Sequence, residues 1–258
     1  MAIEKGSFIL IDYVCRVKET GEVFDTTLED VAKKEGVYRE DTRYEPMLVV
    51  VGEGWVIRGL DEKLTELEVG KTETLEIPPE KAFGHRDPTK MRMVPLRKFR
   101  EQGITPAPGM QVEVDNRVGV VRSVSGGRVQ VDFNPPLAGK TLVYEVTVKK
   151  VLEKDLDKIK ALIHRRIPNI DVEKFSVKLG EKVVTIEMPP ESFFVQGIQV
   201  AKRGLALDIQ KYLPKFEEIR FVERIRRKEE KEEEKAPTKR KRRAKKEAEE
   251  QPSQESGS

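Results

Sequence analysis

The sequence is poor in the residues that most metal sites and nucleophilic active sites use. Its 258 residues include one cysteine, Cys15, and two histidines, His85 and His164. One cysteine excludes an intramolecular disulfide and a cysteine-based zinc site. The motifs GxSxG, HExxH and GxxxxGK[ST] are absent. We therefore expect a chemistry without metal or cofactor, and we interpret Cys15 as a buried apolar residue.

Long hydrophobic runs are also absent. No stretch approaches the ~20 apolar residues that a membrane span needs. The first eleven residues contain Glu4 and only a five-residue apolar run, unlike a signal peptide. We expect a cytoplasmic protein with no membrane partner.

Most of the chain has no excess of positive or negative charge. The formal net charge is +3, and residues 226–258 carry 12 basic and 9 acidic residues, which leaves 37 of each sign in residues 1–225. A neutral body argues against a nucleic-acid-binding domain. The basic run KRKRR at 239–243 leaves contact with RNA or ribosomes open, but we favour a charged, disordered tail over residues 226–258.

The hydrophobic pattern of the first half predicts a sheet with one helix. Residues 7–18, 47–51 and 71–77 are typical of strands, whereas 56–67 has helical spacing. The next segment predicts a small β-rich module, with a helix at 96–101 and strands at 111–114, 117–124 and 128–133. A last strand at 140–151 would return to the first sheet, which makes the module an insertion.

The second half predicts a small α-β-β-α-β domain. Its elements are a helix at 155–167, strands at 172–179 and 182–188, a helix from Pro189 to about Tyr212, and a strand at 216–225. The sequences EIPPE at 76–80 and EMPPE at 187–191 repeat. We interpret them as two strand-to-helix junctions with proline in the first turn, rather than as a duplication.

Several short motifs occur along residues 1–151, and each alone is weak. They are Ile11-Asp12-Tyr13, Gly21-Glu22-Val23-Phe24-Asp25, Gly52 followed by Val56-Ile57-Arg58-Gly59-Leu60, Val69-Gly70, Ala82-Phe83-Gly84 and Leu142-Val143-Tyr144-Glu145-Val146-Thr147-Val148. In this order they resemble the FKBP-type peptidyl-prolyl cis-trans isomerases. The long flap and Asn134-Pro135-Pro136-Leu137 resemble the SlyD-like branch, and the C-terminal residues resemble its long archaeal members.

The resemblance implies an α+β fold, an FKBP-like antiparallel half-barrel sheet around a short helix. It predicts an isomerase domain at 1–84 plus 132–152, an insert-in-flap chaperone domain at 85–131 and a C-terminal domain at 153–225. The implied activity is rotation of X-Pro bonds in unfolded or nascent polypeptides, with chaperone activity from the insert.

The family motif carries a proline pocket onto residues of this sequence. The implied lining is Tyr13, Phe24, Asp25, Met47, Val56, Ile57, Leu60, Phe83, Leu137 and Tyr144. Leu60 stands where many members have tryptophan, Phe83 replaces a frequent tyrosine, and Met47 replaces an aromatic residue. These departures predict weak macrolide binding rather than loss of isomerase activity.

For the insert, we expect an exposed apolar patch for unfolded chains, formed by Met91, Met93, Leu96 and Phe99. Two alternatives to an isomerase-chaperone stay open. One is a non-enzymatic holdase or assembly scaffold with a vestigial pocket, and the other is a nucleic-acid or ribosome adaptor that uses the tail. A homodimer through the C-terminal domain is a further prediction, because a core of about 70 residues is small.

Overall fold

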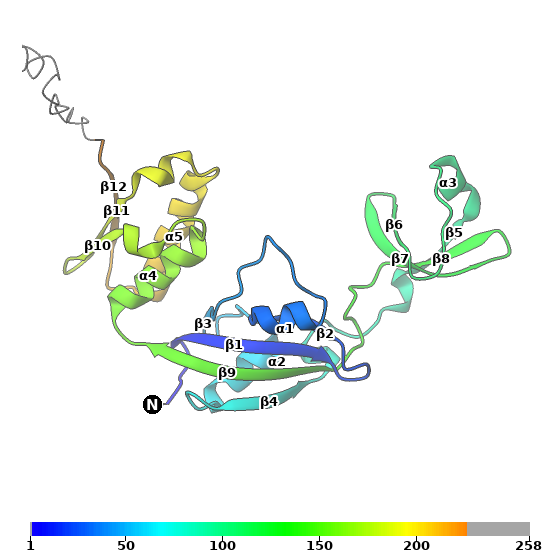
Figure 1. Cartoon of the computed structure of the whole chain (residues 1–258), viewed down its shortest axis with the longest axis horizontal. Helices are drawn as coiled ribbons and strands as arrows, with labels where there is room; N and C mark the ends of the chain where they lie inside the picture. Colours follow the sequence, from blue (N-terminus) through cyan, green and yellow to red (C-terminus); the bar gives the residue numbers. More distant parts are fainter. Residues whose placement is uncertain (1, 226–258) are drawn as a thin grey trace, which may run out of the picture.

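Three separate β-sheets organise the chain in a computed structural model that describes residues 2–225 (Figure 1). The fold is α+β, as expected. In Figure 1 the insert and the C-terminal domain rise from opposite ends of the central sheet, on the same side of it. The predicted tail at 226–258 lies outside the described residues.

The central sheet is antiparallel and wraps one face around a short helix. Its strands run in the order β2-β1-β9-β4, and β3 also pairs with β1. They are β1 (Phe8–Val17), β2 (Val23–Thr26), β3 (Met47–Val50), β4 (Thr72–Ile77) and β9 (Leu142–Leu152). Helix α1 (Glu29–Lys34) follows β2. Strand β9 lies between β1 and β4, although it follows the insert in the sequence. The sheet is therefore completed by residues from beyond the insert.

The helix predicted at 56–67 is shorter than its apolar spacing indicated. Ile57 is still extended, with φ −58° and ψ 146°; helix α2 covers Arg58–Lys63 and a 3-10 turn, η1, covers Leu64–Glu66. Leu60 and Leu64 are fully buried against the central sheet. Val56 and Ile57 therefore remain at the edge of the core instead of on a helix.

The insert has a four-stranded sheet and a core of its own. The strand order is β5-β8-β7-β6. The elements are η3 (Pro88–Lys90), β5 (Met91–Pro95), α3 (Leu96–Glu101), β6 (Gln111–Val114), β7 (Arg117–Ser125) and β8 (Arg128–Asp132). The sequence pattern did not reveal β5, which is a strand because it pairs with β8. Asp115 and Asn116 both have positive φ, as the tight β6–β7 hairpin requires.

The C-terminal domain has the expected α-β-β-α-β order. Its elements are α4 (Asp155–Arg166), η4 (Val172–Lys174), β10 (Ser176–Leu179), β11 (Val183–Met188), η5 (Pro190–Phe194), α5 (Ile198–Tyr212) and β12 (Glu218–Glu223). The helix expected from Pro189 is two elements, because Gly197 has a left-handed φ of 77°. Both repeated proline motifs do follow a strand and open a 3-10 turn, the first being η2 (Pro79–Lys81).

The C-terminal domain shares its core with the central sheet. Phe8 and Leu48 of the sheet are buried in the same cluster as Ile163 of α4 and Ile209 of α5. The rings of Phe8 and Tyr212 meet edge to face, with centroids 6.0 Å apart. The core is therefore larger than residues 153–225 alone could supply.

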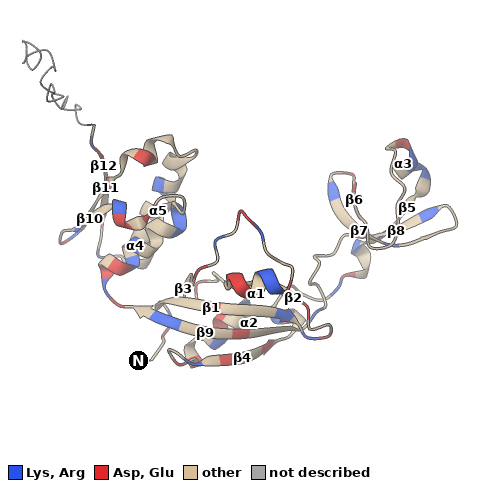
Figure 2. Cartoon of the chain, viewed as in Figure 1, with Lys and Arg blue, Asp and Glu red and all other residues tan. Residues whose placement is uncertain are grey.

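Charge is spread evenly over the domains. Figure 2 shows acidic and basic residues interspersed along the backbone of all three. Within residues 2–225, no helix has the length and apolar character that crossing a membrane demands.

Candidate functional site

Pairing of β1 with β2 brings Tyr13 beside Asp25. The Tyr13 hydroxyl donates a hydrogen bond of 2.7 Å to Asp25 Oδ2, and Asp25 Oδ1 accepts from the amide of Thr26 at 2.9 Å. Burial and the adjacent carboxylate raise the pKa of Tyr13 well above its ordinary value. The phenol thus stays a neutral donor. Asp25 itself is exposed to solvent, so its hydrogen bond with Tyr13 orients the carboxylate rather than compensating for burial.

Strand β9 adds a second tyrosine behind the first. Tyr144 lies opposite Cys15 in the β1–β9 ladder, and its ring centroid is 5.6 Å from that of Tyr13. Burial raises the pKa of Tyr144 far above its ordinary range and that of the Cys15 thiol to about 11. Cys15 is fully buried and neutral, which confirms its interpretation as a packing residue.

Two phenylalanines form an exposed pair. Phe24 from β2 and Phe83, just after η2, meet edge to face with centroids 6.5 Å apart. Their exposed fractions are 44% and 40%, high for large apolar side chains. An apolar ring that packed against both of them would cover part of their exposed surface.

The remaining predicted pocket residues share the central core. Leu60, Leu137 and Tyr144 are buried in one cluster, and Tyr13, Met47, Val56 and Ile57 pack against it half-buried. Tyr13, Asp25 and Met47 also line a groove of 550 Å³, while Phe24 and Leu137 line a hollow of 200 Å³. Seven of the ten predicted residues thus meet in or against one core cluster, Asp25 joins them through Tyr13, and Phe24 and Phe83 contact each other at the surface.

The groove also contains residues that sequence reasoning did not single out. Trp55 lies directly before Val56, and His164, Arg165 and Asn169 come from α4 and the loop after it. Trp55 is the one tryptophan of the sequence, which was the available signal. No sequence pattern connected it with a helix over a hundred residues away.

The predicted patch on the insert is partly wrong. Met93 is 53% exposed, and Met91 and Leu96 are half-buried, but Phe99 is 0% exposed. Phe99 faces inward from α3 and packs with Val121 and Val129 as the largest side chain of the insert core. The insert does expose other apolar side chains, namely Met110, Val118 and Val124.

A buried carboxylate holds the insert to the domain of the central sheet. Asp132, at the end of β8, accepts from Arg122 Nε at 3.1 Å and also pairs with Arg86. Its other oxygen accepts from Asn134 Nδ2 at 2.8 Å, and Asn134 Oδ1 accepts from the amide of Asp87 at 2.9 Å. These contacts join residues 86–87 to residues 132–134, the two segments through which the chain enters and leaves the insert.

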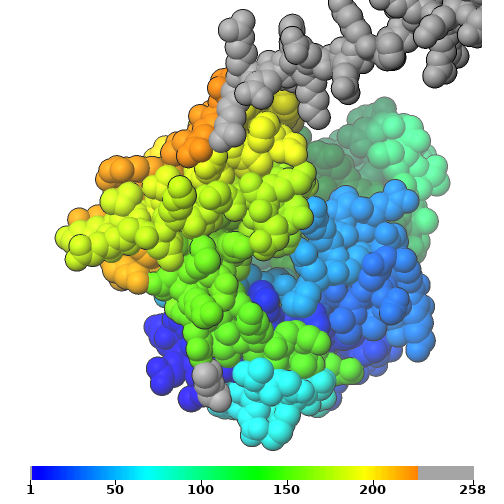
Figure 3. Space-filling view, turned by 60° about the vertical axis from the view of Figure 1, so that its left-hand side comes forward, coloured from blue at the N-terminus to red at the C-terminus, as the bar shows by residue number. Residues whose placement is uncertain are grey.

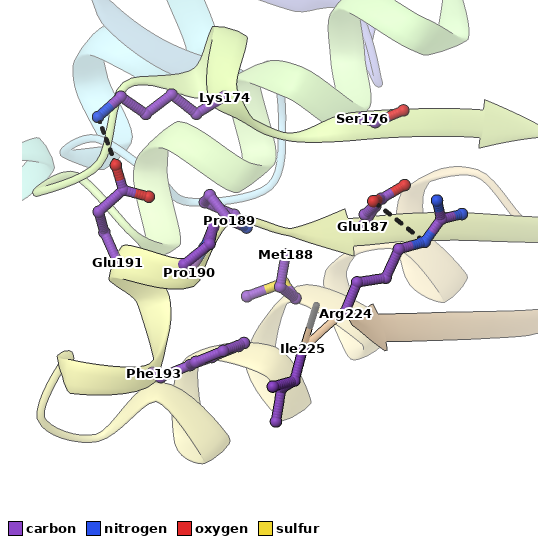
Figure 4. A pocket seen from close by; sticks show the side chains of 10 residues that line it. All are labelled: Lys174, Ser176, Glu187, Met188, Pro189, Pro190, Glu191, Phe193, Arg224 and Ile225. Atoms are coloured by element: carbon purple, nitrogen blue, oxygen red, sulfur yellow. Dashed lines mark hydrogen bonds and ion pairs between the residues drawn. The ribbon is translucent and has the colours of Figure 1, made fainter. Parts of the chain in front are cut away.

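A larger cavity of 810 Å³ opens in the C-terminal domain, at the ends of β11 and β12 (Figure 4). Met188, Phe193 and Ile225 line it, and the pairs Lys174–Glu191 and Glu187–Arg224 flank it. None of the ten predicted pocket residues lines this cavity. Across residues 2–225, no three His, Cys, Asp or Glu side chains are grouped as a metal site would require.

Family models match the two added regions. The model described as FKBP26, IF domain, matches residues 92–137, and the model described as FKBP26_C-terminal matches residues 155–226.

Named relatives cover the isomerase domain and insert. The chain is 36% identical over 149 residues to the short-type peptidyl-prolyl cis-trans isomerase of Methanocaldococcus jannaschii, covering 58% of this chain and 94% of that protein. It is 32% identical over 169 residues to the FKBP-type peptidyl-prolyl cis-trans isomerase SlyD of Treponema pallidum, covering 64% and 87%. The SlyD of Helicobacter pylori is 29% identical over 160 residues, covering 60% and 78%.

The antiparallel sheet around a short helix, the inserted four-stranded module and these similarities agree with the resemblance seen in the motifs. The chain therefore belongs to the FKBP-type peptidyl-prolyl cis-trans isomerases, in the branch with an insert-in-flap domain and an additional C-terminal domain.

Proposed function

We propose that the isomerase site of this enzyme is the surface formed by the ten predicted residues, with the exposed Phe24–Phe83 pair as its entrance. The observation that carries the proposal is this exposed aromatic pair, which lies beside the Tyr13–Asp25 hydrogen bond because Phe24 directly precedes Asp25 in β2.

The reaction needs an apolar, shaped surface more than it needs acid–base chemistry. Partial double-bond character gives the X-Pro amide a rotational barrier of ~18–20 kcal/mol. The isomers differ by only about 0.5–1 kcal/mol, so no driving force is required. A low-polarity site disfavours the polar planar amide relative to the twisted transition state. Phe24, Phe83 and Tyr144 would hold the proline ring while the preceding carbonyl turns.

Substitution at the entrance tests the site. In a peptide isomerisation assay, Phe24→Ala should lower kcat/KM about tenfold or more, because an apolar ring contact worth about 1.5–3 kcal/mol is lost. Asp25→Ala should also lower it, by freeing the Tyr13 hydroxyl. Phe194→Ala is the matched control, since Phe194 is an exposed phenylalanine of η5 in the C-terminal domain. Equal rates for all four proteins would contradict the proposed site.

We also propose that the insert binds unfolded cytoplasmic polypeptides and delivers them to this site. Met93 and Val118 are 53% and 62% exposed on a small domain that already has a closed core. A nearby adhesive surface raises the effective concentration of a chain at a weak pocket. The unfolded chain is thus the proposed partner of the enzyme.

The experiment is refolding of a protein limited by one proline isomerisation, with catalytic amounts of enzyme. The double variant Met93→Ser with Val118→Ser should lower the enzyme-catalysed refolding rate several-fold. Its isomerisation rate on a short peptide should be unchanged. Suppressed aggregation without any acceleration by the intact enzyme would instead favour the holdase with a vestigial pocket.

A second copy of the chain is the other partner we propose, through η5 and α5. Phe194 is 90% exposed, and Val200 and Leu207 project from α5 with exposed fractions of 76% and 57%. Such a group of apolar side chains is typical of an interface. Sedimentation should give a dimer that Val200→Lys with Leu207→Lys converts to a monomer, and a wild-type monomer would contradict it.

A further inference from the structure

The groove of 550 Å³ lies between the isomerase domain and the C-terminal domain. One wall carries Tyr13, Asp25, Arg43 and Met47. The other wall is formed by Ala161, His164 and Arg165 of α4 and by Pro168 and Asn169 after it. Figure 3 shows the regions of both walls meeting on one face, the blue segment before β3 beside the yellow-green C-terminal domain.

Specific contacts fix the two walls relative to each other. Trp55 donates from Nε1 to the hydroxyl of Tyr212 at 2.9 Å, and the guanidinium of Arg165 lies 3.5 Å from the Trp55 ring centroid. His164 Nε2 is 2.6 Å from Glu45 Oε1, across the groove. With the shared core below, these contacts make the groove preformed, which reduces the entropic cost of binding.

The groove is continuous with the proposed isomerase site. Tyr13, Asp25 and Met47 belong to both, and Trp55 at the base of the groove directly precedes Val56 and Ile57. A polypeptide whose X-Pro bond lies at Phe24 and Phe83 would therefore enter the groove with residues next to that bond.

The chemistry of the groove suits an extended chain with one large apolar side chain. Its base is apolar, with Leu10, Met47 and Trp55. At the rim, Arg43 and Arg165 have no ion-pair partner among the carboxylates of residues 2–225. Asp25 and Glu45 are already engaged, by Tyr13 and His164. The guanidinium N–H groups are thus free to donate to backbone carbonyls of a bound peptide.

We propose that this groove is a second subsite for the substrate: its apolar base at Leu10, Met47 and Trp55 selects a hydrophobic residue flanking the X-Pro bond, and Arg165 and Arg43 hold the backbone of that flanking segment. The C-terminal domain then contributes directly to substrate selection. The inference rests on the proposed isomerase site, because the groove is useful only if the X-Pro bond lies beside it.

Two peptides with the same X-Pro core separate the groove from the pocket. The short one has a single residue on each side of the dipeptide, and the long one adds four residues on each side, including a phenylalanine. For the wild type, kcat/KM should favour the long peptide by about tenfold, the discrimination typical of one apolar side chain in a pocket. Arg165→Ala and Arg43→Ala should each reduce this ratio at least threefold.

Arg203→Ala is the matched control and should keep the ratio, because Arg203 is an exposed arginine of α5 that does not line the groove. Equal kcat/KM for both peptides with the wild type, or equal losses for both with Arg165→Ala, would overturn the inference. A ratio that changes with enzyme concentration would identify a second copy of the chain as the occupant and would also overturn it.

Crosslinking distinguishes failure of the groove from failure of the site. A long peptide with a photoreactive phenylalanine should crosslink to residues 161–169, and crosslinks confined to the insert would contradict the groove. If the crosslinks form in the groove but Phe24→Ala retains full activity, the proposed isomerase site is wrong and the groove stands as a peptide-binding site.

Discussion

The insert and the C-terminal domain are both small additions to the isomerase sheet, yet they are attached in opposite ways. The insert closes its own core around Phe99 and contacts the isomerase domain through a polar joint at Asp132. The C-terminal domain instead buries Phe8 and Leu48 of the sheet in a common core. A domain with its own core can change position without exposing apolar core residues of its neighbour. A domain with a shared core instead contributes to the folding stability of its neighbour.

The largest expected effect separates the two kinds of core. Phe8→Ala should reduce the free energy of unfolding by about 3–5 kcal/mol, because a fully buried ring is lost where sheet and C-terminal domain meet. Phe99→Ala deletes an equally buried ring, but from the insert alone. Thermal unfolding and short-peptide activity should show that Phe8→Ala damages the isomerase and Phe99→Ala only the insert. Loss of short-peptide activity in Phe99→Ala would contradict separate cores.

A smaller effect is expected at the polar joint of the insert. Asp132→Ala leaves Asn134 and two arginines without their acceptor, at a cost of about 1–3 kcal/mol. Hydrogen exchange at residues 86–90 and 132–134 should accelerate, and refolding catalysis should fall while short-peptide activity persists. Asp132→Asn retains one acceptor oxygen and is the control. Unchanged exchange in Asp132→Ala would mean that apolar contacts, not this carboxylate, hold the insert.

The smallest expected effect is a difference in alkaline stability. The pKa of Cys15 rises from 9.0 to about 11 on folding, because burial disfavours the thiolate. The folded state therefore binds this proton more tightly, and the resulting stability is complete below pH 9 and lost as the pH rises through 11. Tyr13 and Tyr144 act in the same direction at higher pH.

All three groups lie in the central sheet, so alkali should destabilise the isomerase and C-terminal domains before the insert. Melting curves at pH 8 to 11 should fall less steeply for Cys15→Ala than for the wild type. Parallel curves would show that the thiol does not contribute.

Local patterns in the sequence determined most of the elements and the family. Alternation predicted the strands at 111–114 and 128–133, helical spacing predicted α4, and the motifs around Tyr13, Phe24 and Tyr144 pointed to the isomerase family. These signals are local, since a side-chain period shows which face of an element is apolar.

Only the tertiary structure decided which apolar faces meet. The strand β5 exists because β8 pairs with it, and Phe99 is core rather than surface because α3 turns it toward Val121 and Val129. The groove between Trp55 and Arg165 depends on two segments more than a hundred residues apart. A periodic pattern shows that a surface must be buried but not against what, so the docking of the C-terminal domain and the groove it forms required the folded chain.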